Sequence, residues 1–271
     1  MPQPTSDAVA KSAPVKRPTP VVRILAPDDL MGALSGGWQD FKAAPRYGLA
    51  LSGVYVFGGW LLMLLATAAG LHYFVYPLAT GFALVAPFVA AGLYEVSRRL
   101  ETGAPLSWAG VIGAVRAGGV RDLGWMALVT TFAFLIWIDM AMFIYLMFFG
   151  LKSPSPVELL TEIATTGHGA LFFLVGNLVG AVIAIFIFSI TVVSFPLLLD
   201  RDVDFVTAMI VSTRAVKANK VQMLSWAALI GLFLAASLLT GLLSLFLTLP
   251  LIAHASWRLY RKVVEPESAP E

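Results

Sequence analysis

The chain has 271 residues, of which 59% are hydrophobic and only 13% are charged, and its mean hydropathy is +0.84. A soluble domain is about half apolar and a quarter charged, so this composition excludes water as the main solvent and indicates a membrane protein. The net charge of +2, without a clustered basic face, argues against nucleic acid as a partner, and the absence of cysteine excludes disulfides and thiolate chemistry.

The first 27 residues are rich in proline and small polar residues, and they contain Lys11, Lys16, Arg17 and Arg23. This composition predicts a disordered, cationic tail. The tail has no apolar stretch of the kind that a cleavable signal peptide needs, so we expect the first span to direct insertion. A membrane domain over residues 28–264 should follow, and residues 265–271 should form a second disordered tail.

Apolar stretches long enough to cross a bilayer follow the tail, because a span needs about 20 apolar residues. Residues 47–70 and 73–96 form a first pair, and residues 124–150 and 169–199 form a second pair. The run over 223–260 is too long for one span, and a weak break at Thr240 and Gly241 divides it in two. We therefore predict an all-α, polytopic membrane protein with six transmembrane helices arranged as three hairpins.

The distribution of Lys and Arg tests this topology, because basic residues in short loops mark the cytoplasmic side. With six spans, 17 of the 18 Lys and Arg residues fall on the side of the two termini. Only Lys152 falls on the opposite side. We therefore expect both termini in the cytoplasm.

Each cytoplasmic segment before an odd-numbered span has the pattern of an amphipathic surface helix. Asp28 or Asp29 can cap the first helix, Ser107 can cap the second, and Asp202 can cap the third. We expect these helices to lie in the membrane interface with their apolar sides toward the lipid.

An internal repeat relates residues 113–128 to residues 214–229, which align without gaps and share eight identities in 16, including Trp125 with Trp226. The even-numbered spans also each contain a proline near the cytoplasmic half, and we expect these prolines to kink the helices. These are Pro87, Pro196 and Pro250. The pattern predicts three units of surface helix plus hairpin; the alternative is that amphipathic helices that enter membranes simply resemble one another.

Asp139 lies inside the third span, where a carboxyl group is costly and is therefore a candidate functional group. Asn177 in the fourth span lies at a similar depth, so the two side chains could meet. One interpretation is a proton- or cation-responsive site reached from outside. The interpretation we favour is that Asp139 and Asn177 hydrogen-bond to each other and join two helices.

Small residues recur every four positions on the fourth span, at Gly176, Gly180 and Ala184. This spacing predicts a face on which another helix packs closely.

An acidic cluster follows the same span. Its carboxylates could bind a divalent cation, but capping of the next helix and pairing with arginine are the favoured interpretation. The cluster consists of Asp200, Arg201, Asp202 and Asp204.

The external loop predicts a short helix with Ser155 as its cap and Pro156 at its first position. Glu162 and His168 could form a weak metal site at its end, although a solvated acidic face is the favoured interpretation. His72 and His254 are not expected to be ligands, so we predict no metal and no cofactor.

The segment PLLLDRDVDFVTAM over 196–209 and the segment LPLIAHASWRLYRKVV over 249–264 resemble a bacterial family of integral membrane proteins classed as domain of unknown function 2189. The resemblance covers about residues 30–264. It implies a bacterial inner-membrane location and a helical architecture, but no activity. Some members are labelled cytochrome oxidase subunit I, but a haem–copper core needs several histidines within spans, and this chain has only His254 there.

No catalytic motif is present, so we expect a protein that is not an enzyme. The favoured function is a scaffold, assembly or accessory component of the inner membrane. Its partners would be membrane lipids and other inner-membrane proteins or further copies of itself. The alternative is a transporter or permease for a small solute or ion, centred on Asp139 and Asn177.

Overall fold

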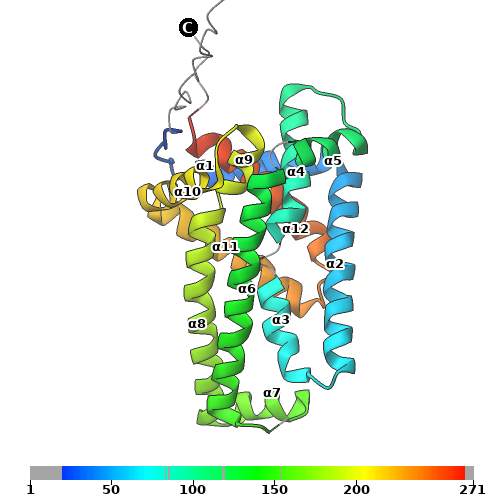
Figure 1. The fold of residues 1–271 in the computed structure, drawn as a ribbon, viewed down its shortest axis with the longest axis vertical. Helices are drawn as coiled ribbons and strands as arrows, with labels where there is room; N and C mark the ends of the chain where they lie inside the picture. The colour runs from blue at the N-terminus through cyan, green and yellow to red at the C-terminus, as the bar shows by residue number, and fades with distance from the viewer. Residues whose placement is uncertain (1–19, 83, 85, 118–119, 153, 266–271) are drawn as a thin grey trace, which may run out of the picture.

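The computed structural model describes residues 20–82, 84, 86–117, 120–152 and 154–265, and these form a helical bundle (Figure 1). Apart from one 3-10 turn and one isolated bridge, the regular structure of this part of the chain is α-helix. The elements are α1 (Asp29–Ala43), α2 (Pro45–Ala68), η1 (His72–Phe74), α3 (Val75–Phe82), α4 (Ala86–Thr102), α5 (Trp108–Ala117), α6 (Val120–Phe149), α7 (Pro156–Thr165), α8 (Gly167–Thr191), α9 (Ser194–Asp200), α10 (Phe205–Ala218), α11 (Lys220–Leu239) and α12 (Leu245–Val263).

The long helices run side by side and the short helices gather at the two ends of the bundle (Figure 1). At one end lie α1, α5, α9 and α10, and at the other end lies α7. Within the described residues, five helical segments are long and apolar enough to cross a membrane. They are Pro45–Ala68, Val75–Thr102, Asp122–Phe149, Gly167–Asp200 and Lys220–Leu239. The all-α fold is therefore confirmed, and the first five predicted spans coincide with helices that are long and apolar enough to cross a membrane.

The predicted break between the last two helices is present, but α12 is not among those five segments. The turn after α11 contains Gly241 and Leu242, which both have positive φ, and the indole of Trp60 donates a hydrogen bond to the carbonyl of Gly241 at 2.7 Å. Trp60 lies eight residues before the end of α2, about 12 Å at 1.5 Å per residue. The turn of the α11–α12 hairpin therefore lies inside the bundle, short of its α7 end.

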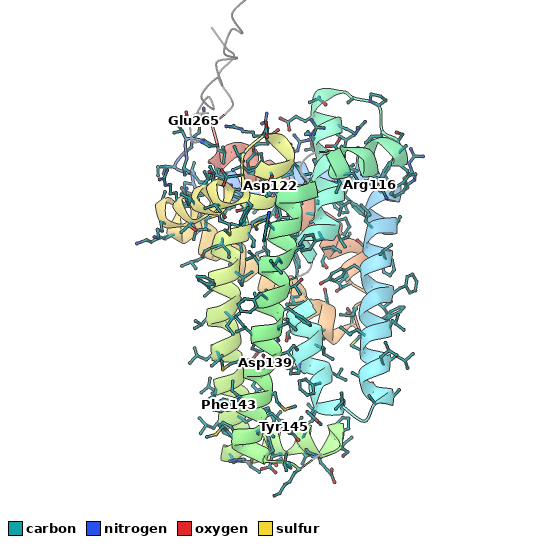
Figure 2. All side chains as sticks on the ribbon, viewed as in Figure 1. Arg116, Asp122, Asp139, Phe143, Tyr145 and Glu265 are labelled. Carbon is teal, nitrogen blue, oxygen red and sulfur yellow. The ribbon has the colours of Figure 1, made fainter. Side chains whose placement is uncertain are left out.

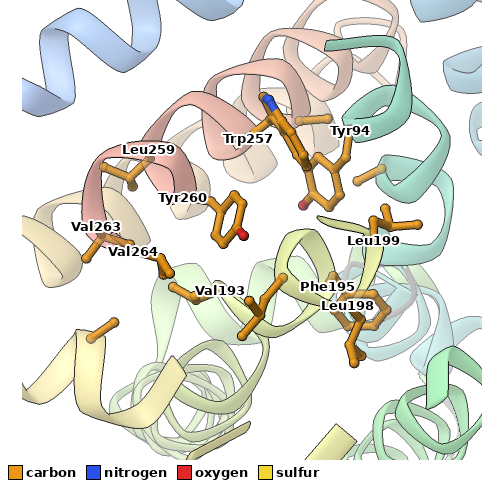
Figure 3. Close-up of a cluster of buried hydrophobic side chains, with 14 of the residues drawn as sticks. Tyr94, Val193, Phe195, Leu198, Leu199, Trp257, Leu259, Tyr260, Val263 and Val264 are labelled. Atoms are coloured by element: carbon orange, nitrogen blue, oxygen red, sulfur yellow. The ribbon is translucent and has the colours of Figure 1, made fainter. Parts of the chain in front are cut away.

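Helix α12 is the central element of the end that carries the short helices. Its second half is almost fully buried, because α1, α4 and α9 pack around it. Trp257 and Tyr260 from α12 meet Phe195 from α9 and Tyr94 from α4 in one apolar cluster (Figure 3). Three charged side chains in α12 explain why a helix this deeply packed lacks the hydropathy of a span.

Helix α1 is packed against α12 and is not a detached surface helix. Gly37 makes this possible, since a Cβ atom there would lie 2.5 Å from the backbone nitrogen of Ala255. Exposed apolar side chains remain on the other sides of α1, at Met31 and Trp38. The helix therefore combines a docked face with a face that is free to meet lipid or a partner.

Residues 20–27, the last part of the predicted N-terminal tail, contact the helical bundle. Leu25 is buried, and the side-chain amide of Asn219 accepts a hydrogen bond from its backbone N–H and donates one to the carbonyl of Arg23. Val22 also pairs with Val264 in an antiparallel bridge. Long-range backbone pairing, which local composition does not reveal, orders residues 20–27; residues 1–19 lie outside the described part.

One of the three predicted proline kinks coincides with a helix break among the described residues. Pro196 is the third residue of α9, directly after the break that follows α8, whereas Pro87 is the second residue of α4. Ser212 of α10 bridges the break after α8, because its hydroxyl accepts a hydrogen bond from Val193 N–H and donates one to the carbonyl of Ser189. Pro250 lies inside the continuous helix α12.

The start of α10 differs from the prediction. Its cap is Asp204, whose carboxylate accepts a hydrogen bond from Thr207 N–H, and not Asp202. The backbone is still extended at Asp204, so the helix starts two residues later than expected. The caps predicted at Ser107 for α5 and at Ser155 for α7 are confirmed.

Candidate functional site

Asp139 lies on the outward face of α6, in the half of the bundle nearer α7 (Figure 2). Leu135 and Phe143, one turn before and one turn after it, are 52% and 59% exposed. Its carboxylate has no hydrogen-bond or ion-pair partner among the residues that the structure describes. The predicted meeting with Asn177 does not occur, because Asp139 points away from the side of α6 that faces α3 and α8.

Asn177 instead bonds to α3. Its side-chain oxygen accepts a hydrogen bond of 2.8 Å from the hydroxyl of Tyr76, and its amide donates one to the carbonyl of Phe173. The second N–H of this amide has no partner within the described residues. Asn177 therefore links two helices while it keeps one donor free.

One of the three positions on the predicted small-residue face of α8, Gly180, packs closely against another helix. A Cβ atom at Gly180 would lie 2.8 Å from the indole ring of Trp137, and one at Gly81 of α3 would lie 2.4 Å from the same ring. Trp137 of α6 is thus held between two glycines, and its N–H donates a hydrogen bond to the carbonyl of Pro77. Gly176 has open space where a Cβ would be.

The open space beside Gly176 belongs to a cavity of about 230 Å³, which we call the aromatic cavity. Seven aromatic side chains account for much of its wall, and apolar side chains of α7 close one end. Tyr76 and Asn177 supply the main side-chain hydrogen-bonding groups, and none of the lining residues is charged. The lining residues used below are Tyr73, Tyr76, Trp137, Ile163, Gly176 and Asn177.

A second cavity of about 300 Å³ lies on the other side of Trp137, between α3, α8 and α11. It shares Tyr76, Trp137 and Asn177 with the aromatic cavity, while Gly180 and Ala184 belong to its own wall. Asp139 lines neither cavity. Of the two residues in the predicted polar pair, Asn177 thus lines both cavities, and its partner is Tyr76.

The acidic cluster after α8 is part of an ion-pair layer around α12. Asp200 accepts hydrogen bonds from the hydroxyl of Tyr260 at 2.5 Å and from Arg261 at 3.2 Å. Arg201 pairs with Asp200 and donates to the carbonyl of Glu265. These contacts support the favoured interpretation of capping and pairing over a cation site.

Electrostatics at the edge of this layer follow from the same contacts. The hydrogen bond from Lys262 holds the pKa of Asp29 below its ordinary value. Hydrogen bonds from the side chain and backbone of Thr207 lower the pKa of Asp204 in the same way.

The centre of the layer is a buried polar chain that sequence reasoning missed. Asp40 of α1, which is 4% exposed, receives two hydrogen bonds from Arg258 at 2.6 and 2.9 Å and one from Ser97 at 2.9 Å. The Ser97 oxygen lies 2.8 Å from Nδ1 of His254, which is fully buried. The spacing of four residues between His254 and Arg258 was the available signal, but their partners come from helices 157 or more residues away.

Glu95 is a further missed residue. It is 1% exposed, and it binds both Arg98 and Arg99 at 2.7 Å within α4. All these groups come from α1, α4, α9 and α12, so the layer fixes the packing of those helices.

The pair of Glu162 and His168 lies where α7 meets α8. His168 lies 3.8 Å from Glu162, and its ring packs against Phe148 and Phe149. Among the described residues, no group of three or more side chains is arranged to ligate a metal ion.

Residues 75–200 match the family of predicted integral membrane proteins called DUF2189. The match confirms the resemblance seen in the sequence, although it ends at Asp200 and so leaves out most of the motifs that carried it. No curated protein and no solved structure matches the chain. Together with the five apolar helices, the match identifies an integral membrane protein.

Proposed function

We propose that this protein is a non-enzymatic component of the bacterial inner membrane that associates laterally with another membrane protein through the outward face of α6. The supporting observation is Asp139, an exposed carboxyl between Leu135 and Phe143 on an apolar helix. A charged side chain at the centre of a membrane helix costs about 3 kcal/mol on insertion scales. A partner helix that supplies a hydrogen-bond donor reduces this cost, so the face is better suited to protein than to lipid.

The occupant we propose is a different membrane protein with a basic or amide side chain at matching depth. A second copy of this chain would bring a second carboxyl to the first across a symmetric interface, and two carboxylates repel each other. The opposite charge or a neutral donor fits the face better.

For the topology we propose six crossings with both termini cytoplasmic and α12 as the sixth. The described ends, near Val22 and Val264, lie together beside the short helices, as an even number of crossings requires. The same end carries a basic surface at the end of α10 and the start of α11, where Arg214, Lys217 and Lys220 are exposed. Cationic side chains next to exposed apolar ones favour contact with anionic headgroups.

The internal duplication is also part of this proposal. Residues 113–128 and 214–229 both run from a short helix into the start of a long one, α5 into α6 and α10 into α11. Their packing has diverged, since Trp125 is 47% exposed and stacks on Phe205, whereas Trp226 is 1% exposed.

The transport hypothesis required Asp139 and Asn177 to share one site. Because Asp139 lines neither cavity, nothing in the geometry favours that hypothesis, and we do not retain it.

Site-specific photocross-linking in the native membrane tests the proposed association. A photoreactive phenylalanine analogue replaces Phe143 beside Asp139, and in a control protein it replaces Phe57, which is 60% exposed on α2. We expect a defined adduct larger than the 29.1 kDa chain from position 143 alone, and its loss in the background of Asp139→Leu. Asp139→Asn, which keeps a hydrogen-bonding side chain, should preserve it.

Equal cross-linking at both positions, or an adduct insensitive to Asp139→Leu, would refute the proposed association. An adduct of twice the chain mass would show self-association and would refute a different protein as the partner.

The topology can be tested separately, because the chain contains no cysteine. Single cysteines replace Lys152 and, in a second protein, Glu265, and intact cells with a permeabilised outer membrane are treated with a membrane-impermeant maleimide. We expect labelling at position 152 and protection at position 265. Labelling of both positions or of neither would contradict six crossings.

A further inference from the structure

We propose that the aromatic cavity binds a neutral lipid whose headgroup carries a hydroxyl or carbonyl oxygen. The inference is independent of the association proposed for α6, because the cavity lies on the opposite side of that helix from Asp139. It rests on the shape of the cavity, its missing charges and its unused hydrogen-bonding groups.

The cavity opens toward the lipid. Tyr76 and Phe173, two of its lining residues, are 45% and 46% exposed on neighbouring helices. A ligand can therefore enter sideways from the bilayer without passing through water. At the far end, Leu159 and Ile163 of α7 contribute apolar side chains to the wall.

The helix α7 that closes this end is firmly attached. Gly169 allows α8 to approach so closely that a Cβ atom there would lie 2.2 Å from the carbonyl oxygen of Glu162. The hydroxyl of Tyr145 donates a hydrogen bond to the carbonyl of Lys152, just before α7. The cavity is therefore a formed feature of the fold and not a gap under a loose loop.

Hydrogen-bonding groups at the cavity wall select the headgroup. Tyr76 uses its proton on Asn177, so its oxygen remains available as an acceptor. Asn177 uses one N–H on the carbonyl of Phe173, so its second N–H remains available as a donor. An unused amide N–H in an apolar setting is costly, and a ligand oxygen would satisfy it.

The missing charges exclude phosphate headgroups. Among the described residues that line this cavity there is no Lys, Arg, His, Asp or Glu, so a phosphate group would be buried without a partner. A hydroxyl can bond both to the free N–H of Asn177 and to the oxygen of Tyr76, and a carbonyl can bond to the first. Aromatic walls suit the apolar remainder of such a lipid or a flat carbonyl-bearing ring.

The test uses the purified full-length protein in phosphatidylcholine nanodiscs that contain a small fraction of photoreactive lipid. The three probes are a diacylglycerol with a free hydroxyl, an isoprenoid quinone with ring carbonyls, and phosphatidylcholine itself. Mass spectrometry then locates the labelled peptides. We expect at least one neutral probe to label the segments around Tyr73 and Ile163 about fivefold more than phosphatidylcholine does, the preference that one additional hydrogen bond supplies.

Variants separate binding in the cavity from contact with the protein surface. Gly176→Leu fills the cavity from a position with open space, so we expect it to fold and to abolish the preferred labelling. Gly124→Leu, at another open and exposed position on α6, is the matched control and should label normally. Asn177→Leu and Tyr76→Phe should reduce the neutral-lipid preference toward one.

The labelling results distinguish a lipid bound in the cavity from annular lipid. Preferential labelling by the diacylglycerol alone or by the quinone alone supports the proposal and identifies the source of the headgroup oxygen. Equal labelling by all three probes means annular lipid only and overturns it. Preferential labelling that persists in Gly176→Leu also overturns the proposal. If this variant does not fold, an unchanged neutral-lipid preference in Tyr76→Phe and Asn177→Leu overturns the proposal instead.

Discussion

The contact between α1 and α12 depends on one missing side chain, at Gly37. An added Cβ atom would lie 2.5 Å from the nitrogen and 2.7 Å from the Cα of Ala255. Non-bonded carbons rarely approach closer than about 3.5 Å, so Gly37→Ala must push the helices about 1 Å apart. Both atoms belong to the backbone, so no side chain can rotate away to relieve the contact.

The magnitude follows from two opposing effects. Alanine favours a helix over glycine by about 1 kcal/mol, whereas overpacking a tight interface costs about 1–3 kcal/mol. Separation of the helices also stretches the pair between Asp40 and Arg258, whose short contact is 2.6 Å. We therefore expect Gly37→Ala to lower the free energy of unfolding by about 2 kcal/mol, and the melting temperature by about 5 °C.

Gly113→Ala is the matched control, because Gly113 lies on the surface helix α5 with nothing within 4 Å of an added Cβ. It should leave stability unchanged or raise it by up to about 1 kcal/mol. Tryptophan fluorescence during heating in a mild detergent measures both proteins. If Gly37→Ala melts at or above the temperature of Gly113→Ala, the close packing of α1 on α12 is refuted.

Three further predictions concern single polar contacts. Asp40→Ala leaves the partly buried Arg258 without its carboxylate and should cost about 3–5 kcal/mol, measured by denaturant titration; a loss below 1 kcal/mol would contradict the proposed pair. The hydrogen bonds from Thr207 lower the pKa of Asp204, so this cap stabilises α10 above the pKa that the carboxyl has in the unfolded chain, and the stabilisation is lost as the pH falls below about 4. The free energy of unfolding of the wild type should therefore fall more on acidification than that of Asp204→Asn. Parallel curves of unfolding free energy against pH for the two proteins would refute this. Ser212→Ala leaves the break between α8 and α9 with unpaired buried backbone groups and should lower stability by about 1–3 kcal/mol in the same titration, whereas an unchanged midpoint would show that water replaces the hydroxyl.

Local rules explain the part of the fold that the sequence predicts well. The apolar runs identify α2, α6 and α8 because each backbone N–H and C=O in a bilayer must be satisfied within its own helix. Ser155 and Ser107 were correctly identified as caps because a cap bonds to residues only three positions away.

Contacts between distant parts of the chain were not predicted. Asn219 binds the backbone of Leu25 from 194 residues away, and local composition does not indicate this contact. Asp40 and His254 join one buried chain through Ser97, and no spacing in the sequence brings these three together.

The sequence by itself determined the solvent, the helical class and the positions of most helices, because hydropathy and capping act over a few neighbouring residues. Only the tertiary structure decided which side of α6 faces inward, and this turned Asp139 outward while Trp137, two residues earlier, packs between Gly81 and Gly180. The rotation of an apolar helix is set by the shapes that pack against it, since lipid tails and protein side chains are almost equally apolar.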